Sequence, residues 1–476
     1  MMIVSDRMRL FAFDFMAPTH LSAGLWRHAD DRGHRYRDLS FWTEYAQLLE
    51  AACLDGVFFA DHAGYHDVYE GEAVGALADA AQIPLIDPFL VVPAMASVTR
   101  HLGFGITGST SYDHPYAMAR RFASLDHLTG GRVGWNLVTS YSDSAARNLG
   151  TGEQTPHDER YDMAAEYLEV CHKLWEDSWD DDAVVRDAER GIYVDATRVH
   201  DINHHGRYFR VPGFAQWEPS PQRSPVIFQA GGSSKGRALA AASAEGVFVN
   251  AVSKAALKRQ VDGLRALATE YGRDPRNIKV LQMLNVVVAP TDDLAHEKYE
   301  SYRRLVSYTG AMARYSGWSG LDMSQFDPDV PLRHVQTQDG QTMIDIFSKM
   351  DPDKEWTPRD IAEFIGIGGA GPTIVGSPST VADELIAWKD ETGITGYNLA
   401  NALKYQDMAD FIELVVPELQ RRGVAQTSYE GSTLRETLYG VGTSRLSPDH
   451  PGARGRRDLG RADNLRHRES LLRSAG

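Results

Sequence analysis

The chain has 476 residues, of which 43% are hydrophobic, and a formal net charge of −16 at pH 7. This length and apolar content suffice for one large domain with insertions or for two domains. The negative charge argues against nucleic acids and anionic membranes as partners, because both attract a basic protein face. The sequence has no apolar run long enough to span a membrane and no signal-peptide core at its start, so we expect a cytoplasmic protein without membrane association.

Strand-like and helix-like segments alternate along the chain. The first four pairs are predicted at Met8–Phe15 and Phe41–Cys53, Gly56–Asp61 and Pro88–Thr99, Leu102–Ser109 and Pro115–Leu128, and Arg132–Thr139 and Arg160–Trp175. The last four are predicted at Pro225–Ala230 and Lys235–Ala244, Gly246–Val252 and Lys254–Tyr271, Ile278–Ala289 and Leu294–Leu305, and Gly396–Ala400 and Met408–Arg422. Eight such units predict an α/β fold whose parallel sheet closes into a (β/α)8 TIM barrel. An open, doubly wound sheet is the alternative.

Two long insertions, at about residues 177–222 and 308–372, interrupt a single predicted barrel domain that spans residues 1–443. Insertions in barrels often form lids over the strand ends, and a packing segment or an oligomer contact is the alternative for each. Residues 444–476 form a tail with eight arginines and four acidic residues. We expect this tail to be disordered or to dock on a neighbouring subunit of a homodimer or homotetramer.

The segment Gly130–Gly150 carries the strongest functional signal. Its predicted strand ends in a run of polar groups that starts at Asn136 and continues from Thr139 to Asp143. Barrels of this class build their sites at the carboxyl ends of the strands. Asp61 ends an earlier predicted strand in the same way, and it is either a site residue or a loop cap.

A second signal, Ala230–Arg237 (AGGSSKGR), follows a predicted strand and opens a helix. Free backbone N–H groups and the helix dipole favour an anion there, and Ser233 and Ser234 add hydroxyl donors. The segment is either a phosphate site or an ordinary serine N-cap. His157 and Tyr161 stand four positions apart at a predicted helix start, so they share one face. Their side chains are suited to bind a phosphate or the edge of a ring. The alternative is that they only cap the helix and pack in the core.

Two G-x-G-x-x-G matches, at Gly103–Gly108 and Gly366–Gly371, stand in the wrong context for a dinucleotide fingerprint. The first lies within a strand, and the second follows a helix and precedes an extended segment. We therefore expect no tightly held nicotinamide cofactor. The histidines lack the spacings typical of metal ligands, so we expect no metal site.

Several motifs occur in an order that points to a family: GRVGWNLVTS at Gly131–Ser140, DSAARN at Asp143–Asn148, His157 with Arg160–Asp162, Gln229–Arg237, and GLWRH at Gly24–His28. With these motifs the chain resembles the bacterial-luciferase-like flavin monooxygenases from about Met8 to Gly423. Within that family it is most similar to the branch of nitrilotriacetate, dibenzothiophene sulfone and dimethyl sulfide monooxygenases.

The resemblance implies a barrel that binds reduced FMN (FMNH2) at the strand ends and uses O2 as co-substrate. It also implies a two-component system, in which a separate NAD(P)H:flavin reductase supplies the FMNH2. By motif match, the residues around the flavin ring would be Asp61, Thr107, Ser109 and Asn136. Those that hold the ribityl chain and phosphate would be His157, Tyr161, Ser233 and Ser234.

The protein must also exclude water from the reaction and handle a proton. Candidates for an apolar wall are Phe13, Trp26, Phe59, Tyr65, Tyr112 and Trp135. His20, after the first strand, is the predicted proton-handling residue, with His28 and His114 as alternates, because a histidine pKa lies near neutrality.

The expected activity is oxygenation of a small, largely apolar substrate, either an organosulfur compound or a haloaromatic, with cleavage of a C–S or C–Cl bond. The loop Ala63–Pro84 and the second insertion are expected to shape the pocket. These segments hold no arginine cluster, which disfavours a polyanionic substrate. A deazaflavin-dependent dehydrogenase on the same barrel, or a non-catalytic flavin-binding protein, are the alternatives. Eight complete βα units argue against the second.

Overall fold

The computed structural model describes residues 7–332, 347 and 354–453. Eight parallel strands form one sheet, which runs in the order β1 (Arg9–Phe15), β2 (Gly56–Ala60), β3 (Gly103–Ser109), β4 (Val133–Val138), β9 (Val226–Gln229), β10 (Gly246–Val249), β11 (Lys279–Val288) and β13 (Gly396–Ala400). β10 pairs with β11, and β13 pairs with β1, so the ring closes. The predicted TIM barrel is thereby confirmed and the open sheet is excluded.

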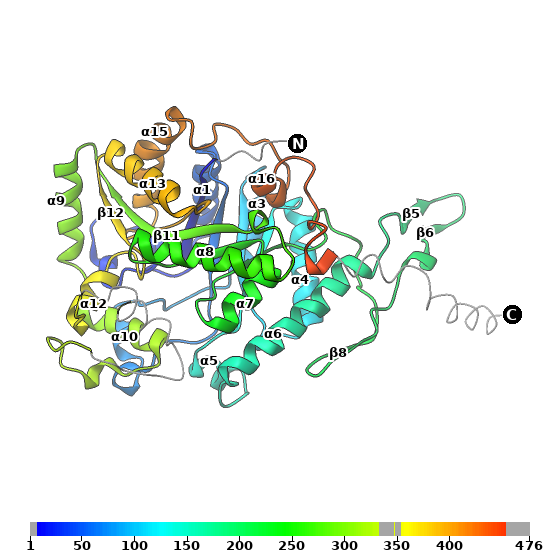
Figure 1. Cartoon of the computed structure of the whole chain (residues 1–476), viewed down its shortest axis with the longest axis horizontal. Helices are drawn as coiled ribbons and strands as arrows, with labels where there is room; N and C mark the ends of the chain where they lie inside the picture. Colours follow the sequence, from blue (N-terminus) through cyan, green and yellow to red (C-terminus); the bar gives the residue numbers. More distant parts are fainter. Residues whose placement is uncertain (1–6, 333–346, 348–353, 454–476) are drawn as a thin grey trace.

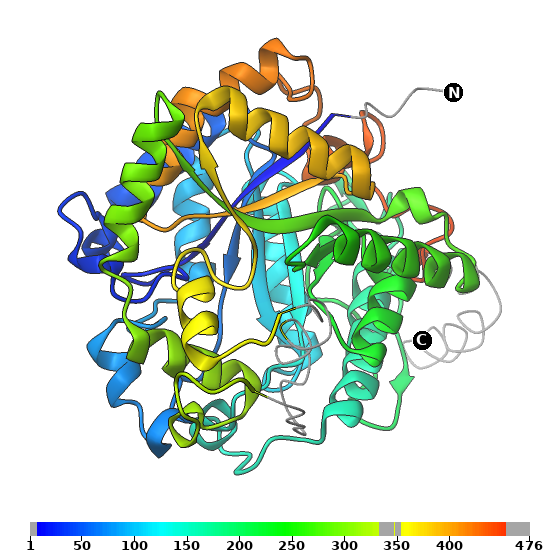
Figure 2. The same cartoon turned by 60° about the vertical axis from the view of Figure 1, so that its left-hand side comes forward.

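Helices surround the strands (Figure 1, Figure 2). Those that follow or precede the barrel strands are α1 (Leu39–Ala51), α3 (Pro88–Ser97), α4 (Pro115–Thr129), α6 (His157–His172), α7 (Ser234–Ser243), α8 (Lys254–Glu270), α9 (Asp292–Arg303) and α13 (Pro378–Thr392). The last is α14 (Gln406–Asp410), which continues through a π-helical turn (Phe411–Val415) into α15 (Val416–Arg421). In α8, for example, Leu257, Val261, Leu264 and Ala268 recur at helical spacing, and all four are buried, because this stripe faces the sheet.

The first insertion lies on the outside of the barrel and covers no strand end. The hairpin of β5 (Val184–Asp187) with β6 (Ile192–Val194) projects beyond α6 (Figure 1). The hairpin of β7 (His204–His205) with β8 (Arg210–Val211) lies beside α6, where the Phe209 N–H donates to the Glu166 carboxylate. Trp217 packs edge-on against Tyr116 of α4, with ring centroids 5.5 Å apart. The structure describes all of residues 177–222, and none of them lines the large cavity described below. This insertion is therefore not a lid over the cavity, and the packing segment and the oligomer contact both remain open for it.

The second insertion lies against the carboxyl ends of the strands. Its described elements are α10 (Tyr308–Ser319) and α12 (Pro358–Ile365), and β12 (Thr373–Gly376) follows and adds to the end of β11. Trp318 of α10 and Ala370 line the cavity. The lid alternative therefore fits this insertion, although its residues 333–346 and 348–353 lie outside the described residues. Two short helices, α2 (Val74–Ala78) and α5 (Asp143–Asn148), complete this end of the barrel.

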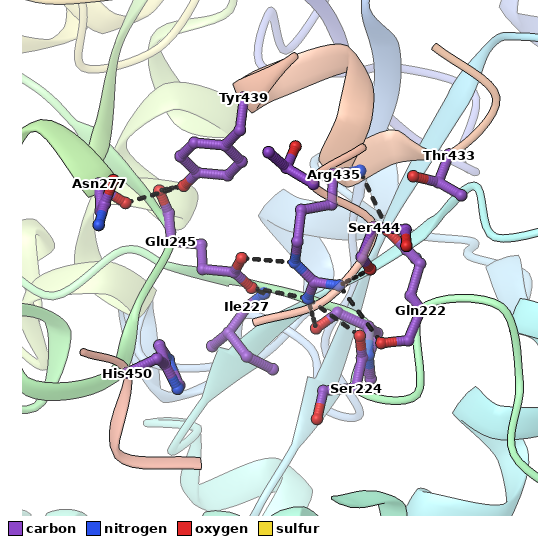
Figure 3. Close-up of polar contacts among 12 residues, drawn as sticks. Gln222, Ser224, Ile227, Glu245, Asn277, Thr433, Arg435, Tyr439, Ser444 and His450 are labelled. Carbon is purple, nitrogen blue, oxygen red and sulfur yellow. Dashed lines mark hydrogen bonds and ion pairs between the residues drawn. The ribbon is translucent and has the colours of Figure 1, made fainter. Parts of the chain in front are cut away.

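Helix α16 (Leu434–Tyr439), which the sequence patterns did not predict, closes the opposite, amino end of the barrel. Leu434 and Leu438 pack inside the barrel with Phe11 and Phe228. Arg435 donates two hydrogen bonds to the Glu245 carboxylate, from Nε at 2.7 Å and from Nη2 at 3.0 Å (Figure 3). It also donates to the backbone carbonyls of Gln222, Ser224, Pro225 and Ser444. This fully satisfied buried cation fastens the helix across the strand ends.

The start of the arginine-rich tail docks on its own barrel. The Asp449 carboxylate accepts hydrogen bonds from the Asp274 N–H at 2.8 Å and from the Asn277 side chain at 3.2 Å. The His450 ring donates from Nε2 to the Ser243 carbonyl at 2.7 Å. The expected disorder is thus wrong for residues 444–453, and docking of the tail on a neighbouring subunit stays a prediction. The rest of the tail, 454–476, lies outside the described residues. Among the described helices, none is long and apolar enough to span a membrane.

Arg435→Met should destabilise the protein by about 3–5 kcal/mol, because it leaves the Glu245 carboxylate buried without its partner. The measurement is the free energy of unfolding from urea titration. Arg276→Met is the matched control, since Arg276 is 87% exposed and forms a surface ion pair with Asp274. That control should change the free energy by less than about 1 kcal/mol. Equal losses in the two variants would contradict this account of the barrel end.

Candidate active site

A cavity of about 480 Å³ opens at the carboxyl ends of the barrel strands. Its size is typical of a site for a small molecule or cofactor, and its position is the usual one in barrels of this class. Residues from most barrel strands contribute to its lining, among them Phe13, Phe58, Thr107, Asn136, Gln229, Val249, Met283 and Asn398. The loop 63–84, which the sequence analysis expected to shape a pocket, contributes Ala63 and Gln82.

The inner part of the cavity is apolar and rich in aromatic rings. Phe58 contacts Phe248 and Phe13, with ring centroids 4.2 and 5.2 Å apart. Leu21, Phe15 and Met283 extend the same lining. An apolar chamber of this kind excludes water from a reaction carried out inside it.

Of the expected wall residues, only Phe13 lines the cavity. Successive side chains of a strand point to opposite faces of the sheet. Phe58 and Asn136 therefore point inward, whereas Phe59 and Trp135 belong to the core between strands and helices. Trp26 is 46% exposed at the surface. Tyr65 and Tyr112 also lie outside the lining.

Asn136 presents a free hydrogen-bond acceptor at the cavity. Its Nδ2 donates to the Thr107 hydroxyl at 3.0 Å, and that hydroxyl donates to the Phe59 carbonyl at 2.9 Å. The two contacts fix the amide, so that its Oδ1 remains buried without a hydrogen-bond partner. An unsatisfied buried acceptor is costly, which makes it suited to a ligand N–H group. Ser109, in contrast, lies behind the lining and bonds to the Ser140 hydroxyl at 2.8 Å.

Asp61 directly follows β2 and lines the cavity, as a site residue at a strand end would. Its carboxylate accepts a hydrogen bond from the His62 N–H at 2.9 Å. Burial and, secondarily, the negative charge of Asp87 raise the pKa of Asp61 to about 6. The carboxyl group therefore carries a proton at a higher pH than an ordinary aspartate.

Besides His157, described below, the structure brings His62 to the cavity lining, and the sequence analysis did not select this residue. Its Nε2 is buried without a hydrogen-bond partner, and burial lowers the pKa of its ring. Behind it, the His66 ring bonds through Nε2 to Oε1 of Gln82 at 2.9 Å. A neutral imidazole with a free nitrogen at the cavity is suited to accept or hold a proton. Its place immediately after Asp61 was the signal that could have identified it.

The structure does not bring the three histidines predicted from the sequence to the cavity lining. His20 lies behind Phe13, with ring centroids 4.5 Å apart, and its Nδ1 is 3.7 Å from the Asp14 carboxylate. His28 packs against Tyr302. His114 is the N-cap of α4 and accepts a hydrogen bond from the Tyr116 N–H. A proton-handling role for His20 stays a prediction. A proton that moves between His20 and a substrate in the cavity would have to pass Phe13, which lies in front of the His20 ring.

The outer end of the cavity is an anion cradle built on the start of α7. Ser233 is the N-cap, and its hydroxyl accepts a hydrogen bond from the Gly236 N–H at 3.1 Å. Gly231 and Gly232 line the cavity beside it, and a Cβ on Gly231 would lie only 2.9 Å from the Gly236 backbone. Glycine therefore lets the chain fold tightly enough to direct backbone N–H groups at one point.

His157 and Tyr161, from the first turns of α6, line the same end of the cavity, with ring centroids 5.1 Å apart. The Tyr161 hydroxyl lies close to α7, since a Cβ on Gly236 would be 2.8 Å from it. Arg237 completes the lining of this end and donates to the Gly232 carbonyl at 2.6 Å. Ser234, the first residue of α7, is outside the lining. The two sequence motifs thus converge on one cationic and hydroxyl-rich corner.

Asp61→Asn should raise the melting temperature at pH 8, because a buried carboxylate is costly and the amide carries no charge. A raised pKa in the folded state means that stability falls as pH rises from about 4 to about 6 and stays lower above that range. The advantage of the variant should therefore shrink as the pH falls from 6 to 4. Thermal unfolding across this pH range is the measurement, with the surface variant Asp390→Asn as control. A constant difference at every pH would contradict the assignment.

The chain matches the family model described as luciferase-like monooxygenase over residues 13–396. It is 46% identical over 453 residues to dimethyl-sulfide monooxygenase of Hyphomicrobium sulfonivorans, which covers 95% of this chain and 94% of that protein. It is 45% identical over 453 residues to long-chain alkane monooxygenase of Geobacillus thermodenitrificans (strain NG80-2), with 95% and 99% covered.

Solved structures agree with these relatives. DmoA from Hyphomicrobium sulfonivorans superposes with a TM-score of 0.89 at 46% identity, covering 95% of this chain and 97% of that chain. The long-chain alkane monooxygenase LadA gives 0.86 at 45% identity, with 94% and 99% covered. The riboflavin lyase RcaE, solved with modified FMN and riboflavin, gives 0.89 at 37% identity, with 95% and 99% covered. The chain therefore belongs to the luciferase-like monooxygenases.

Proposed function

We propose that this protein is the oxygenase of a two-component system. It takes FMNH2 from a separate NAD(P)H:flavin reductase and uses O2 to oxygenate a small organosulfur compound, with cleavage of a C–S bond. The observation that carries the proposal is one cavity that joins an anion cradle at Ser233 to an aromatic chamber inside the barrel. An organosulfur substrate is preferred to a haloaromatic because a relative of nearly full length is named for a sulfide.

The residues of the cavity fit FMN. A phosphate suits the start of α7, where backbone N–H groups, the Ser233 and Tyr161 hydroxyls, His157 and Arg237 converge. A flavin ring suits the part of the cavity around Asn136, whose unpartnered Oδ1 would accept a ring N–H. Asp61 and Thr107 border the same part. FMN bound to the related riboflavin lyase supports the choice of cofactor.

Reduced FMN, when bound, supplies the electrons and the site at which O2 is activated. The chain's own residues bind and orient it through the cradle and Asn136. Phe13, Phe58 and Phe248 exclude water from the reacting region. His62, with a neutral ring and a free Nε2, can hold a proton at the cavity.

The two alternative functions of this barrel differ from the proposal in what they consume. A deazaflavin-dependent dehydrogenase would transfer hydride without O2 and without a flavin reductase. A flavin-binding protein without catalysis would consume no sulfide, and membership of a monooxygenase family argues against it. Coupled oxygen consumption therefore separates the proposal from both.

Purified protein with NADH, FMN, a flavin reductase and dimethyl sulfide should consume O2 and the sulfide together. Omitting either the reductase or FMN should stop the reaction. Photoreduced FMN should restore one turnover without the reductase, because the reductase serves only to supply reduced flavin. An oxygen electrode and gas chromatography of the sulfide are the measurements. Flavin reoxidation with no loss of this or any other organosulfur compound would contradict the proposal.

Ser233→Ala combined with Tyr161→Phe should weaken FMNH2 binding by about 1–3 kcal/mol, through loss of hydrogen bonds to a charged phosphate. Anaerobic titration is the measurement. Ser253→Ala is the matched control, because Ser253 caps α8 by accepting from the Ala256 N–H but lies away from the cavity. It removes an equivalent helix cap and should leave affinity unchanged. Unchanged affinity in the double variant would remove the phosphate from this corner.

A further inference from the structure

We infer that Arg314 places a fixed positive charge behind the inner end of the cavity, so that the preferred substrate carries one anionic group, a carboxylate or a sulfonate. The inference deepens the proposed function, on which it rests, by naming a substrate class for the same cavity. The remainder of the substrate, including its sulfur, would lie in the aromatic chamber.

Arg314 lies on α10 and is 1% exposed. Its guanidinium donates to the backbone carbonyl of Leu21 and, at 2.6 Å, to that of Ile365. It also lies over the Trp318 ring, with Cζ 4.8 Å from the ring centroid. Leu21 and Trp318 both line the cavity. The cationic head group is therefore in direct contact with residues that line the cavity.

This guanidinium is short of partners for a buried cation. It carries five N–H donors, and its Nε is buried without a hydrogen-bond partner. In the described part of the chain, no aspartate or glutamate oxygen lies within 4 Å of it. A buried charge without a counterion is strongly unfavourable, so an anion that binds nearby supplies a charge that the described residues do not provide.

Another buried arginine shows how such a residue is satisfied when its role is purely structural. Arg132 also lacks a carboxylate partner, but it donates five hydrogen bonds. Its acceptors are the Thr99 hydroxyl and the carbonyls of Ala96, Thr99, Leu102 and Thr129. Arg314 has two acceptors where Arg132 has five, and Arg314 alone of the two adjoins the cavity. The difference points to a ligand as the missing partner.

The groups around Arg314 do not neutralise it. Burial first, then the neighbouring His62 and, as a smaller contribution, the Arg314 charge lower the pKa of His66 to about 3. Burial and the charges of Lys404 and Arg314 also lower the pKa of His20. Desolvation raises the pKa of Tyr141, so this phenol is neutral. The Asp14 carboxylate is already paired with Lys404. Burial lowers the pKa of Arg314 to about 9, so it stays protonated at neutral pH.

One uncompensated cation favours one anionic group rather than several. This agrees with the absence of an arginine cluster from the pocket loops, which disfavoured a polyanion. The aromatic chamber requires the rest of the molecule to be apolar. A methylthio group joined by a short chain to a carboxylate or a sulfonate satisfies both conditions.

The test compares matched probes in equilibrium binding. Calorimetry on the full-length protein with FMN bound would use 3-(methylthio)propionate, 2-(methylthio)ethanesulfonate and the neutral 3-(methylthio)propionamide. We expect at least one of the two anions to bind about 10- to 100-fold more tightly than the amide, the range of a hydrogen bond to a charged group. Equal affinities for the anions and the amide in the wild-type protein would overturn the inference.

Variants then assign the preference to one residue. Arg314→Gln should reduce the ratio of anion to amide affinity to about one, and Arg314→Lys should retain part of it. Arg190→Gln, which removes a surface arginine that is 73% exposed, should leave the ratio unchanged. If Arg314 only ties α10 to Leu21 and Ile365, Arg314→Gln lowers stability but keeps the ratio, and the inference fails.

Three further outcomes show whether the inference and the proposed function stand or fail independently. If Arg314→Gln does not fold, the wild-type ratio and Arg314→Lys still decide, because neither depends on that variant. Arg314→Gln that weakens FMNH2 binding but keeps the preference for the anion would overturn the inference, since the charge would then serve the cofactor. An anion preference in a protein that consumes no O2 would support the inference and contradict only the oxygenase proposal.

Discussion

The buried contact between Arg435 and Glu245 is the constraint on which the rest of this barrel depends. A barrel with a ligand cavity at one end must be closed at the other, since water reaching the interior from below would weaken both the packing and the site. Here the closure is one short helix, α16, whose leucines enter the barrel between aromatic rings. Its arginine is satisfied by the Glu245 carboxylate, just before β10, and by the carbonyls of Ser224 and Pro225, just before β9. Low dielectric makes this pairing strong and makes its loss costly.

With one end closed, polar chemistry is confined to the other. The strands supply it in an ordered way, because inward positions near their carboxyl ends carry Asn136, Thr107 and Asn398, and outward positions carry core residues. The cavity consequently has two ends of different character. The start of α7 offers backbone N–H groups to an anion, whereas the chamber around Phe58 is lined mainly by aromatic and aliphatic side chains. Such a division orients an asymmetric ligand before any specific contact is considered.

Much of this could be predicted from the sequence, and the failures have physical reasons. The eight strands were predictable because each is a short apolar run bounded by turn residues. Asn136 and Asp61 were predictable because they stand at strand ends. Trp135 was misassigned because aromatic character was given more weight than alternation along the strand, which places it outward. The course of a loop depends on tertiary contacts, so His20 and His114 were not distinguishable from His62 by local pattern. Helix α16 was not predicted because an arginine such as Arg435 is normally assigned to the surface, and its buried partner Glu245 is distant in the sequence.

The position of the first insertion has a practical consequence for building larger assemblies. The turn between β5 and β6 projects away from the barrel (Figure 1), and none of its residues lines the cavity. Exposed loop tips of this kind tolerate the insertion of a whole domain. A second protein grafted at residues 188–191 would leave the barrel core, its closed end and its ligand entrance untouched. The hairpin is thus a suitable attachment point for tethering a partner at high effective concentration without blocking the entry of small molecules into the cavity.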